Sequence, residues 1–415
     1  MMLLYNLTIN GYTAAVRFAS HFNPKARLWV EGRHKIIQRI QEAMKTNQQR
    51  VVWVHCASLG EFEQGRPVIE AIRKQHPAYK ILLTFFSPSG YEVRKNYTGA
   101  DYVFYLPADT PANAREFIAA AKPAVAIFIK YEFWFNFMKE LRHNNIPIII
   151  ISAIFRPGHH FFGWYGFWFL KQLIAINRFY VQNESSGELL RRNGITQVVV
   201  SGDTRFDRVK EVAAQEFSHP VIEAFASGNQ VLIAGSTWPP DEELIVALMK
   251  KPPINLRLLI APHEVDQQRI EQLVKEFGKG ALRLSKANPD SAREARVLIV
   301  DNVGMLSQLY RYGHYAYIGG GFGVGTHNIL EAATFGLPLF FGPNHQKFRE
   351  TIDLIRLRGA FPVSSIACFL SIFEKVASDN YIYQQAHAAC LDYIARNTGA
   401  TEIIMTGLKG YLQEE

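Results

Sequence analysis

The sequence is poor in cysteine, with three in 415 residues. Cys56, Cys368 and Cys390 are odd in number and far apart. They therefore provide neither a disulfide framework nor the spacing of zinc ligands. This cysteine usage predicts a protein of the reducing cytosol.

Long hydrophobic runs are also missing. The moderately apolar residues 1–22 are interrupted by Asn6, Asn10, Arg17 and His21, and no small-residue cleavage site follows them. This segment predicts neither a signal peptide nor a transmembrane helix. Because several basic residues come next, an amphipathic segment in the membrane interface is one interpretation. A helix packed on its own domain is the other.

Acidic residues are scarce in the first half of the chain. Residues 1–201 hold 24 Lys and Arg against 13 Asp and Glu, and the rest of the chain holds 21 against 24. The net charge of +8 therefore arises in the N-terminal half. Such asymmetry indicates a half that meets an anionic surface or substrate, and nucleic acid and anionic lipid are equal candidates at this point.

Short apolar runs are abundant from residue 51 onward. They are apolar without alternation, as expected of strands buried on both faces, and their spacing is typical of βα units in a parallel sheet. The expected strands are residues 51–54, 81–86, 102–106, 125–129, 146–151, 179–181 and 198–200, then 231–234, 256–260, 297–300, 315–318 and 337–341.

A pause in this pattern separates two domains. We expect a Rossmann-like domain over residues 1–201, a linker over 202–228, a second Rossmann-like domain over 229–388, and terminal helices over 389–415 that can cross back to the first domain. The fold class is α/β, and two doubly wound domains facing a cleft make the GT-B arrangement of glycosyltransferases. Functional residues should follow the strands, because ligands of such sheets bind at the carboxyl ends.

A glycine-rich segment between a strand and a short helix is the most informative part of the chain. Its glycines permit positive φ and close backbone approach, so their N–H groups are expected to face a phosphate, together with the helix start near Asn328. Glu331 falls in the first helical turn, where a carboxylate can accept both ribose hydroxyls. An empty glycine-rich turn is the alternative, and His327 beside Asn328 disfavours it. The glycines are Gly319, Gly320, Gly321, Gly323 and Gly325.

Glu61 closes the segment that follows the first strand. A helix expected to begin near Phe62 places this carboxylate at a helix N-terminus, where the dipole stabilises the anion by roughly 0.3–1 kcal/mol. An anionic Glu with access to a hydroxyl can act as a general base. Helix capping is the competing interpretation.

Other polar residues follow strands in the first half. Lys130 and Glu132 precede a run of aromatics and either contact a substrate or pair with each other. Arg156, beside His159 and His160, adds positive charge suited to phosphates. Residues 161–170 are aromatic but too short for a membrane span, so they form either an apolar surface patch or a core between helices.

In the second half, Ser236 and Thr237 place hydroxyls at a strand-to-helix turn, where capping explains them without a ligand. Pro262 and His263 follow the next strand and are placed to line a nucleotide base.

Together these segments resemble the bacterial 3-deoxy-D-manno-octulosonic acid (Kdo) transferases. The resemblance covers most of the chain through residues 55–61, 132–134, 202–207, 236–243 and 319–348. It implies an inverting GT-B glycosyltransferase that moves Kdo from CMP-Kdo to a lipid A precursor. It also implies a peripheral or monotopic protein at the cytoplasmic face of the bacterial inner membrane.

By this resemblance Glu61 is the catalytic base, and segments after residue 230 hold CMP through its phosphate, ribose and cytosine. Lys130 or Arg205 is the candidate for binding the Kdo carboxylate. The expected donor-binding residues are Ser236, Thr237, Pro262, His263, Gly320, Gly321, Gly323, Gly325, Thr326, His327, Asn328 and Glu331. The expected substrate-binding residues are Ser58, Gly60, Lys130, Glu132, Arg156 and Arg205.

No metal-ligand cluster is evident near the glycines, so we expect transfer without a metal or another cofactor. Helix N-termini and cations would stabilise the departing phosphate. The expected partners are CMP-Kdo, a lipid A precursor and the anionic surface of the inner membrane, and not nucleic acid, since no nucleic-acid motif is recognised.

Five positions depart from the family pattern and suggest a divergent branch: Thr326, Ala332, Asp203, Trp238 and Phe135. Two alternatives stay open. One is another GT-B enzyme that uses a UDP-sugar, either a lipid-linked glucosaminyltransferase or a UDP-sugar epimerase. The other is a non-catalytic protein of a membrane surface or of nucleic acid.

Overall fold

The computed structural model describes residues 1–163, 166–253 and 255–413. The chain divides into two units. The first comprises Met1–Arg208 together with Thr398–Glu415, and the second comprises Val209–Asn397. The boundary falls inside α10 (Thr204–Ala214), in the stretch expected as a linker, which also holds α11 (Pro220–Ala226).

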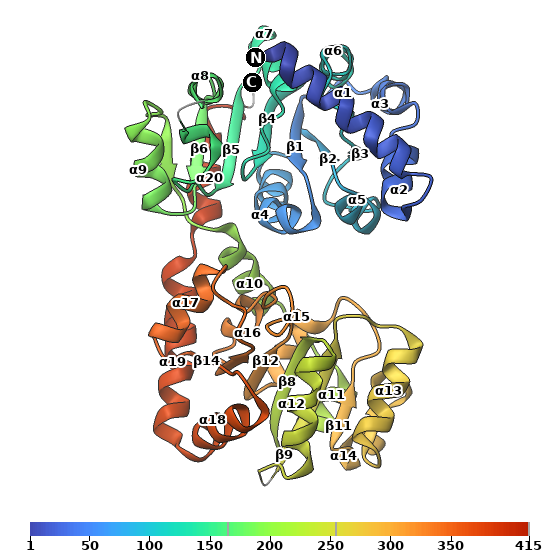
Figure 1. Ribbon diagram of the computed structural model, residues 1–415, viewed down its shortest axis with the longest axis vertical. Coiled ribbons are helices and arrows are strands. Elements are labelled where there is room, and N and C mark those ends of the chain that lie inside the picture. Colours follow the sequence, from blue (N-terminus) through green and yellow to red (C-terminus); the bar gives the residue numbers. More distant parts are fainter. Residues whose placement is uncertain (164–165, 254, 414–415) are drawn as a thin grey trace. The chain divides into compact units, whose positions relative to one another are not determined.

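The first unit is built on a parallel sheet with the strand order β3-β2-β1-β4-β5-β6-β7 (Figure 1). The sheet starts at the inner strand β1, proceeds to one edge, and returns to β4 on the other side of β1. The carboxyl ends of β1 and β4 therefore form the topological switch point at which such sheets bind ligands. The strands are β1 (Val51–Cys56), β2 (Lys80–Phe85), β3 (Tyr102–Tyr105), β4 (Pro123–Ile129), β5 (Ile148–Ala153), β6 (Arg178–Val181) and β7 (Val198–Val200).

Helices cover both faces of this sheet. Along β1, Val51 and Trp53 pack in one apolar core, whereas Val52 and Val54 pack in another on the opposite face. Two buried faces explain why the strand sequences do not alternate. The helices of the unit are α1 (Met2–Ala19), α2 (Pro24–Gly32), α3 (Ile36–Met44), α4 (Leu59–Gln75), α5 (Pro88–Arg94), α6 (Pro111–Ala121), α7 (Phe135–His143), η1 (His160–Phe162), α8 (Phe167–Ile174), α9 (Glu184–Arg192) and α20 (Ala400–Leu408).

The C-terminal residues 398–413 are anchored to the first unit by one carboxylate. Asp207 accepts hydrogen bonds from the Gly399 N–H, the Thr401 N–H and the Thr401 hydroxyl, each at 2.6 Å. Beyond this anchor α20 contacts α4, and Ile404 and Leu408 join the core on that face of the sheet. The first unit is therefore assembled from both ends of the chain.

The second unit has the same architecture, with the strand order β10-β11-β9-β8-β12-β13-β14 and its switch point between β8 and β12. Its strands are β8 (Gln230–Thr237), β9 (Leu256–Pro262), β10 (Ala281–Arg283), β11 (Val297–Ile299), β12 (Tyr315–Ile318), β13 (Leu339–Phe341) and β14 (Ala360–Pro362). Its further helices are α12 (Pro239–Lys250), α13 (Gln267–Phe277), η2 (Leu284–Lys286), α14 (Pro289–Glu294), α15 (Leu306–Leu309), η3 (Tyr310–Tyr312), α16 (Leu330–Ala333), α17 (Arg349–Arg356), α18 (Ile366–Ser378) and α19 (Asn380–Asn397).

The predicted fold class, two doubly wound parallel sheets, is confirmed. Every strand expected from the sequence is present, with small shifts at the ends. The edge strands β10 and β14 were not expected. Each has only three residues, and β14 ends in Pro362, which argues against a strand in a sequence but is tolerated at a sheet edge.

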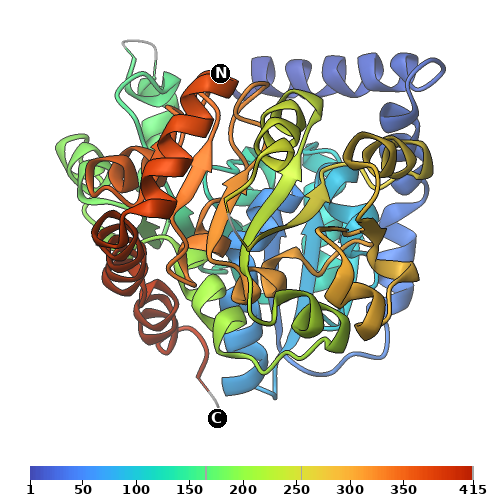
Figure 2. The same ribbon diagram turned by 90° about the horizontal axis from the view of Figure 1, so that it is seen from below.

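Helix α1 lies at the rim of the first unit (Figure 2). None of its residues is buried. Its inward-facing side makes polar contacts: the Tyr5 hydroxyl donates to Asp109 at 2.5 Å, and the Asn6 side-chain oxygen accepts from the Asn136 amide at 2.9 Å. Within the part of the chain that the structure describes, no helix is long and apolar enough to cross a bilayer.

The aromatic stretch 161–170 packs mainly inside the first unit. Phe161 is buried, and Trp168 and Phe169 pack against the same core, whereas Phe167 is exposed. The interpretation as a core between helices therefore holds for most of its described residues. Trp164 and Tyr165 lie outside the described residues.

Candidate active site

Glu61 lies at the switch point of the first sheet, in the first turn of α4. The helix begins at Leu59, earlier than expected, because the backbone is still extended at Ser58 and turns directly after it. One carboxylate oxygen accepts the Ala57 N–H at 2.5 Å. Burial raises the pKa of Glu61, while the Ala57 N–H, the Lys130 cation and the Ser58 N–H oppose that rise.

Glu132 follows β4, the strand that pairs with β1. Burial and the nearby negative charge of Glu61 raise the pKa of Glu132 to about 8. At neutral pH Glu132 is therefore largely protonated, while the Ala57 N–H and Lys130 favour the ionised form of Glu61. Two carboxyl groups whose surroundings separate their pKa values are the usual arrangement for distinct acid and base roles.

His55 lies next to Glu132 and is fixed by hydrogen bonds. Its ring is fully buried and its Nε2 lies 4.0 Å from a Glu132 oxygen. The Trp134 indole N–H donates to Nε2 at 3.1 Å, and Nδ1 lies 2.9 Å from the Thr84 hydroxyl oxygen. Because Nε2 accepts a hydrogen bond, the ring proton is on Nδ1. Burial lowers the pKa of His55 to about 3, which keeps the ring neutral.

Lys130 comes directly after β4 with a left-handed backbone, φ 63°. Such a conformation is costly for a residue with a side chain and is often found at functional sites. Burial lowers the pKa of Lys130, and Glu61 is the carboxylate that opposes this most strongly, ahead of Asp203 and Glu132. The expected interaction between Lys130 and Glu132 is present, but Lys130 interacts more strongly with Glu61.

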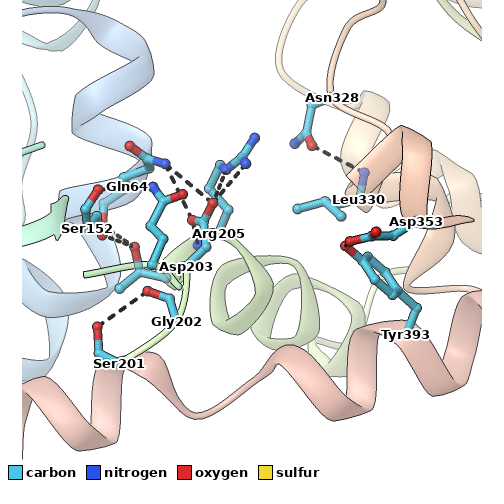
Figure 3. A network of polar contacts seen from close by, with 12 residues as sticks. Gln64, Ser152, Ser201, Gly202, Asp203, Arg205, Asn328, Leu330, Asp353 and Tyr393 are labelled. Carbon is cyan, nitrogen blue, oxygen red and sulfur yellow. Dashed lines mark hydrogen bonds and ion pairs between the residues drawn. The ribbon is translucent and has the colours of Figure 1, made fainter. Parts of the chain in front are cut away.

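Arg205 is already engaged within the first unit (Figure 3). Its Nε and one terminal nitrogen donate to the same Asp203 oxygen at 2.9 and 2.8 Å, and Gln64 approaches Asp203 at 3.4 Å. A Kdo carboxylate would have to share Arg205 with Asp203. This geometry favours Lys130 over Arg205 as the cation for that carboxylate.

The remaining expected substrate residues of this unit lie near the pair. Ser58 is the N-cap residue of α4, and a Cβ added at Gly60 would meet nothing within 4 Å, so sterics do not require glycine there. Arg156 is exposed after β5. Burial raises the pKa of Tyr131, Glu61 and Glu132 raise it further, and Arg156 lowers it, so these groups lie in one region.

The glycines of the second unit serve different purposes. A Cβ on Gly319 would lie 2.2 Å from the Ser236 carbonyl oxygen, and one on Gly321 would lie 2.5 Å from the Gly342 nitrogen. Gly320 and Gly325 have positive φ of 91° and 142°. Gly323 has space around it, with its nearest neighbour at 3.6 Å.

The expectation that the glycine N–H groups face a phosphate is wrong for four of them. The Gly319 N–H donates to the Gly235 carbonyl, and those of Gly323 and Gly325 donate to the Gly320 carbonyl. The Gly320 N–H donates to Asp241 at 2.9 Å. The loop uses these donors to hold its own shape, which a sequence motif cannot show.

Three rings stack beside this loop. The Trp238 and His263 centroids lie 4.6 Å apart, and those of His263 and His327 lie 4.5 Å apart. The Trp238 indole N–H donates to His327 Nε2 at 3.2 Å. Burial and then His263 lower the pKa of His327, which favours the neutral ring. A mainly apolar cavity of about 270 Å³, lined by Trp238, Gly320 and Phe322 among others, adjoins the rings.

Ser236 and Thr237 end β8 at the start of α12. Ser236 has a left-handed backbone, φ 53°. The Thr237 hydroxyl donates to Glu242 at 2.9 Å. The N-cap residue is Trp238, whose N–H donates to Asp241 at 3.0 Å. The capping role expected of Thr237 is therefore carried out by Asp241. Pro262 ends β9 opposite Thr237.

Asn328 and Glu331 are adjacent at α16, and Glu331 lies in the first helical turn as expected. The Asn328 amide donates to Glu331 at 3.1 Å, and its oxygen accepts the Leu330 N–H at 3.2 Å (Figure 3). Thr326 is buried, and its hydroxyl has no hydrogen-bond partner among the described residues. Both Asn328 and Thr326 therefore retain donor or acceptor capacity for a ligand.

Two organising residues were absent from the predicted site. His55 directly follows the expected strand 51–54 and belongs to the segment that resembles the Kdo transferases, but the sequence does not show that its ring is buried next to Glu132. Asp241 joins three elements, since it accepts from the Trp238 N–H, the Gly320 N–H and the Tyr317 hydroxyl. In the sequence, an acidic residue in a first helical turn indicates only helix capping.

The two doubly wound sheets, each with polar residues at its switch point, have the α/β architecture of GT-B proteins. The fold is similar to UDP-GlcNAc 2-epimerase from Neisseria meningitidis, with a TM-score of 0.60 and 16% identity over 87% of this chain and 100% of that one. It is also similar to a glycosyltransferase from Rickettsia africae, with a TM-score of 0.55 and 11% identity over 89% of this chain and 100% of that one. At these identities the likeness concerns the fold alone.

Residues 32–208 match the family model described as 3-deoxy-D-manno-octulosonic-acid transferase (kdotransferase). The 3-deoxy-D-manno-octulosonic acid transferase of Aquifex aeolicus is 26% identical over 329 residues, or 77% of this chain and 83% of that protein. That of Haemophilus influenzae is 26% identical over 384 residues, or 87% of each chain. Residues 32–208 therefore resemble the Kdo transferase domain, and most of the chain is similar to 3-deoxy-D-manno-octulosonic acid transferases.

Proposed function

We propose that this protein transfers Kdo from CMP-Kdo to a glucosamine hydroxyl of a lipid A precursor, in lipopolysaccharide biosynthesis. The observation that supports this proposal most strongly is the pair of carboxyl groups, Glu61 and Glu132, at the switch point of the first sheet. This sheet lies within the residues that match the family model. One carboxyl group of this pair is ready to accept a proton while the other is neutral.

In the proposed step, the acceptor oxygen forms a bond to the anomeric carbon of Kdo while its proton passes to the Glu61 carboxylate. The bond from that carbon to the CMP phosphate oxygen breaks, its electron pair leaves with CMP, and the anomeric configuration inverts. Protonated Glu132 keeps a second negative charge away from the base and offers a hydrogen-bond donor. Lys130 binds the Kdo carboxylate beside Glu61.

The second unit holds the donor. The stacked rings of Trp238, His263 and His327 offer flat surfaces for the cytosine. Glu331 accepts the ribose hydroxyls, with Asn328 as its neighbour. Because four glycine N–H groups are used internally, the Thr326 hydroxyl and the Asn328 side chain are the proposed phosphate contacts.

We propose that α1 holds the enzyme on the cytoplasmic face of the inner membrane. Its outward side is a stripe of exposed apolar residues: Leu3 87%, Leu4 59%, Leu7 69% and Phe18 71% exposed, followed by Phe22 at 79%. An apolar helix face beside a basic chain segment is the usual pattern of an interfacial helix on anionic lipid.

The test is mass spectrometry of the protein incubated with CMP-Kdo, generated in place, and a tetra-acylated lipid A precursor. Wild type should add one or more Kdo units, with or without EDTA, and Glu61→Ala should add none. Glu63→Ala, on the same helix, serves as the matched control. No mass gain from a stable wild-type protein that binds CMP would refute the proposal.

The UDP-sugar alternative rests only on fold likeness to UDP-GlcNAc 2-epimerases. A thermal-shift series with CMP and UDP separates the two functions. Greater stabilisation by UDP would favour the alternative.

A further inference from the structure

Two cavities adjoin each other beneath α1 in the first unit. One has a volume of about 350 Å³ and the other about 420 Å³. Thr13, Trp29 and Ala108 line both. Each volume lies within the range of about 300–1,000 Å³ that is common for ligand sites.

The smaller cavity is mainly apolar, although Asp109 also lines it. Ile9, Tyr12, Phe86 and Trp134 contribute to its walls. The Phe86 and Trp134 rings lie 4.6 Å apart, and Trp134 donates to His55, which approaches Glu132. A molecule in this cavity would therefore touch the same tryptophan that is fixed beside the proposed reaction site.

The larger cavity is basic. Arg17, Arg33, His34 and Lys35 line it, and no acidic residue belongs to its lining. Arg33 donates to the carbonyl oxygens of Leu106, Trp29 and Phe86. No carboxylate among the described residues forms an ion pair with it.

The Arg33 charge is therefore largely buried without a counter-ion. Burial lowers its pKa to about 9, so it remains protonated at neutral pH. Its guanidinium carbon lies 3.8 Å from the Trp29 ring centroid. A buried cation of this kind is costly unless an anion compensates it.

Trp29 supplies a second sign of a missing partner. The residue is 5% exposed, and its indole N–H has no hydrogen-bond partner among the described residues. Buried donors are nearly always satisfied, so each exception needs an explanation. This exception falls on a residue that lines both cavities, next to the buried Arg33 cation.

We infer that the two cavities together bind one molecule, the acylated and phosphorylated glycolipid acceptor, with a phosphate in the basic cavity and an acyl chain in the apolar one. The inference rests on the proposed function and deepens it by assigning acceptor contacts. Bulk phospholipid shares this chemistry but lacks the sugar that must reach Glu61, so we assign the site to the acceptor.

The acyl part is tested by filling the apolar cavity. Thr8 lines it from an exposed position of α1, so Thr8→Trp should occlude the cavity without unfolding the unit. The matched control is Asn10→Trp, since Asn10 is exposed on the same helix and belongs to neither lining. In Thr8→Trp the KM for a tetra-acylated acceptor should rise at least about tenfold. The KM for the de-acylated bisphosphorylated disaccharide should not change. Equal KM values in the two variants would overturn the acyl assignment.

The phosphate part is tested with two changes. Trp29→Phe removes the unsatisfied N–H and keeps a ring, and Arg17→Gln with Lys35→Gln removes two cations. Arg115→Gln with Lys139→Gln is the control, because both residues are exposed and line neither cavity. Each test variant should raise the KM for the bisphosphorylated acceptor about tenfold or more and leave that for the dephosphorylated one unchanged. Equal KM values for the bisphosphorylated acceptor in the test and control variants would overturn the phosphate assignment.

Native mass spectrometry separates this inference from the proposed function. Wild type should retain the tetra-acylated bisphosphorylated disaccharide, and Thr8→Trp should retain less of it, whether or not Kdo is transferred. Absence of turnover with intact, cavity-dependent binding would refute the transferase alone. Equal retention of a short-chain phosphatidylglycerol by wild type would assign the site to bulk lipid and overturn the inference.

Discussion

Glu61 and Glu132 follow the adjacent strands β1 and β4, and the negative charge of Glu61 helps to raise the pKa of Glu132 to about 8. Burial and the charge of Glu61 therefore favour the protonated form of Glu132 at neutral pH. Lys130 and the Ala57 N–H stabilise the ionised form of Glu61, and burial keeps the proton on Glu132.

Loss of the base should abolish transfer while the donor still binds. Glu61→Gln keeps the shape of the side chain, so we expect turnover to fall by about 10²–10⁴-fold, the range for general bases. CMP affinity, measured by calorimetry, should stay within about twofold. Glu63→Gln on the same helix is the control, and near-normal turnover in Glu61→Gln would exclude the assigned role.

The raised pKa of Glu132 predicts a loss of stability at alkaline pH. Between the ordinary value of 4.5 and about 8, the native state keeps a proton that the unfolded chain releases. The free energy of unfolding therefore falls as pH rises through this window. Glu132→Gln cannot ionise, so its stability relative to wild type should increase by a few kcal/mol from about pH 5 to about pH 9 in urea titrations. A pH-independent difference would contradict this.

His55 predicts the opposite dependence at acid pH. Its pKa falls from 6.5 to about 3 on burial, so the unfolded state binds a proton that the native state does not. Stability should be lost as pH falls from about 6.5 toward 3, on the order of 4 kcal/mol in total. Imidazole ¹⁵N chemical shifts at about pH 6 should show a neutral ring with the proton on Nδ1. A protonated ring there would refute the buried network.

The glycine loop predicts a sharp contrast between two substitutions. Gly319→Ala would place Cβ 2.2 Å from the Ser236 carbonyl, whereas Gly323→Ala meets nothing closer than 3.6 Å. We expect Gly319→Ala to destabilise the second unit by about 2–3 kcal/mol or more. Gly323→Ala should change stability by less than about 1 kcal/mol. Similar thermal unfolding of both variants would show that the backbone approach at Gly319 is not required.

The sequence predicts the fold well because strands buried on both faces are continuously apolar, and such runs can be recognised in the local sequence. Val51 to Val54 are all apolar since alternate residues enter two different cores. β10 and β14 lack that signal, because a three-residue edge strand is specified by its neighbour rather than by its own residues.

The site is predictable only in part. Placement of Glu61 and Glu331 follows from strand-to-helix turns, which are local. The roles of Asp241 and His55 depend on partners distant along the chain, Gly320 and Trp134. The same is true of the Gly319 and Gly320 N–H groups, whose acceptors, Gly235 and Asp241, lie outside the glycine segment.

The return of residues 398–413 to the first unit has a consequence during synthesis. The strands of that unit leave the ribosome first, yet Ile404 and Leu408, which cover its α4 side, are made last. At about 5–20 residues per second, translation of Val209–Asn397 takes roughly 10–40 s. During that interval an apolar face of the nascent first unit remains exposed to solvent. The second unit is one continuous stretch of chain and can fold before the first unit is complete. Chaperones on translating ribosomes should accordingly bind mainly to the first unit, and they should dissociate only after α20 emerges.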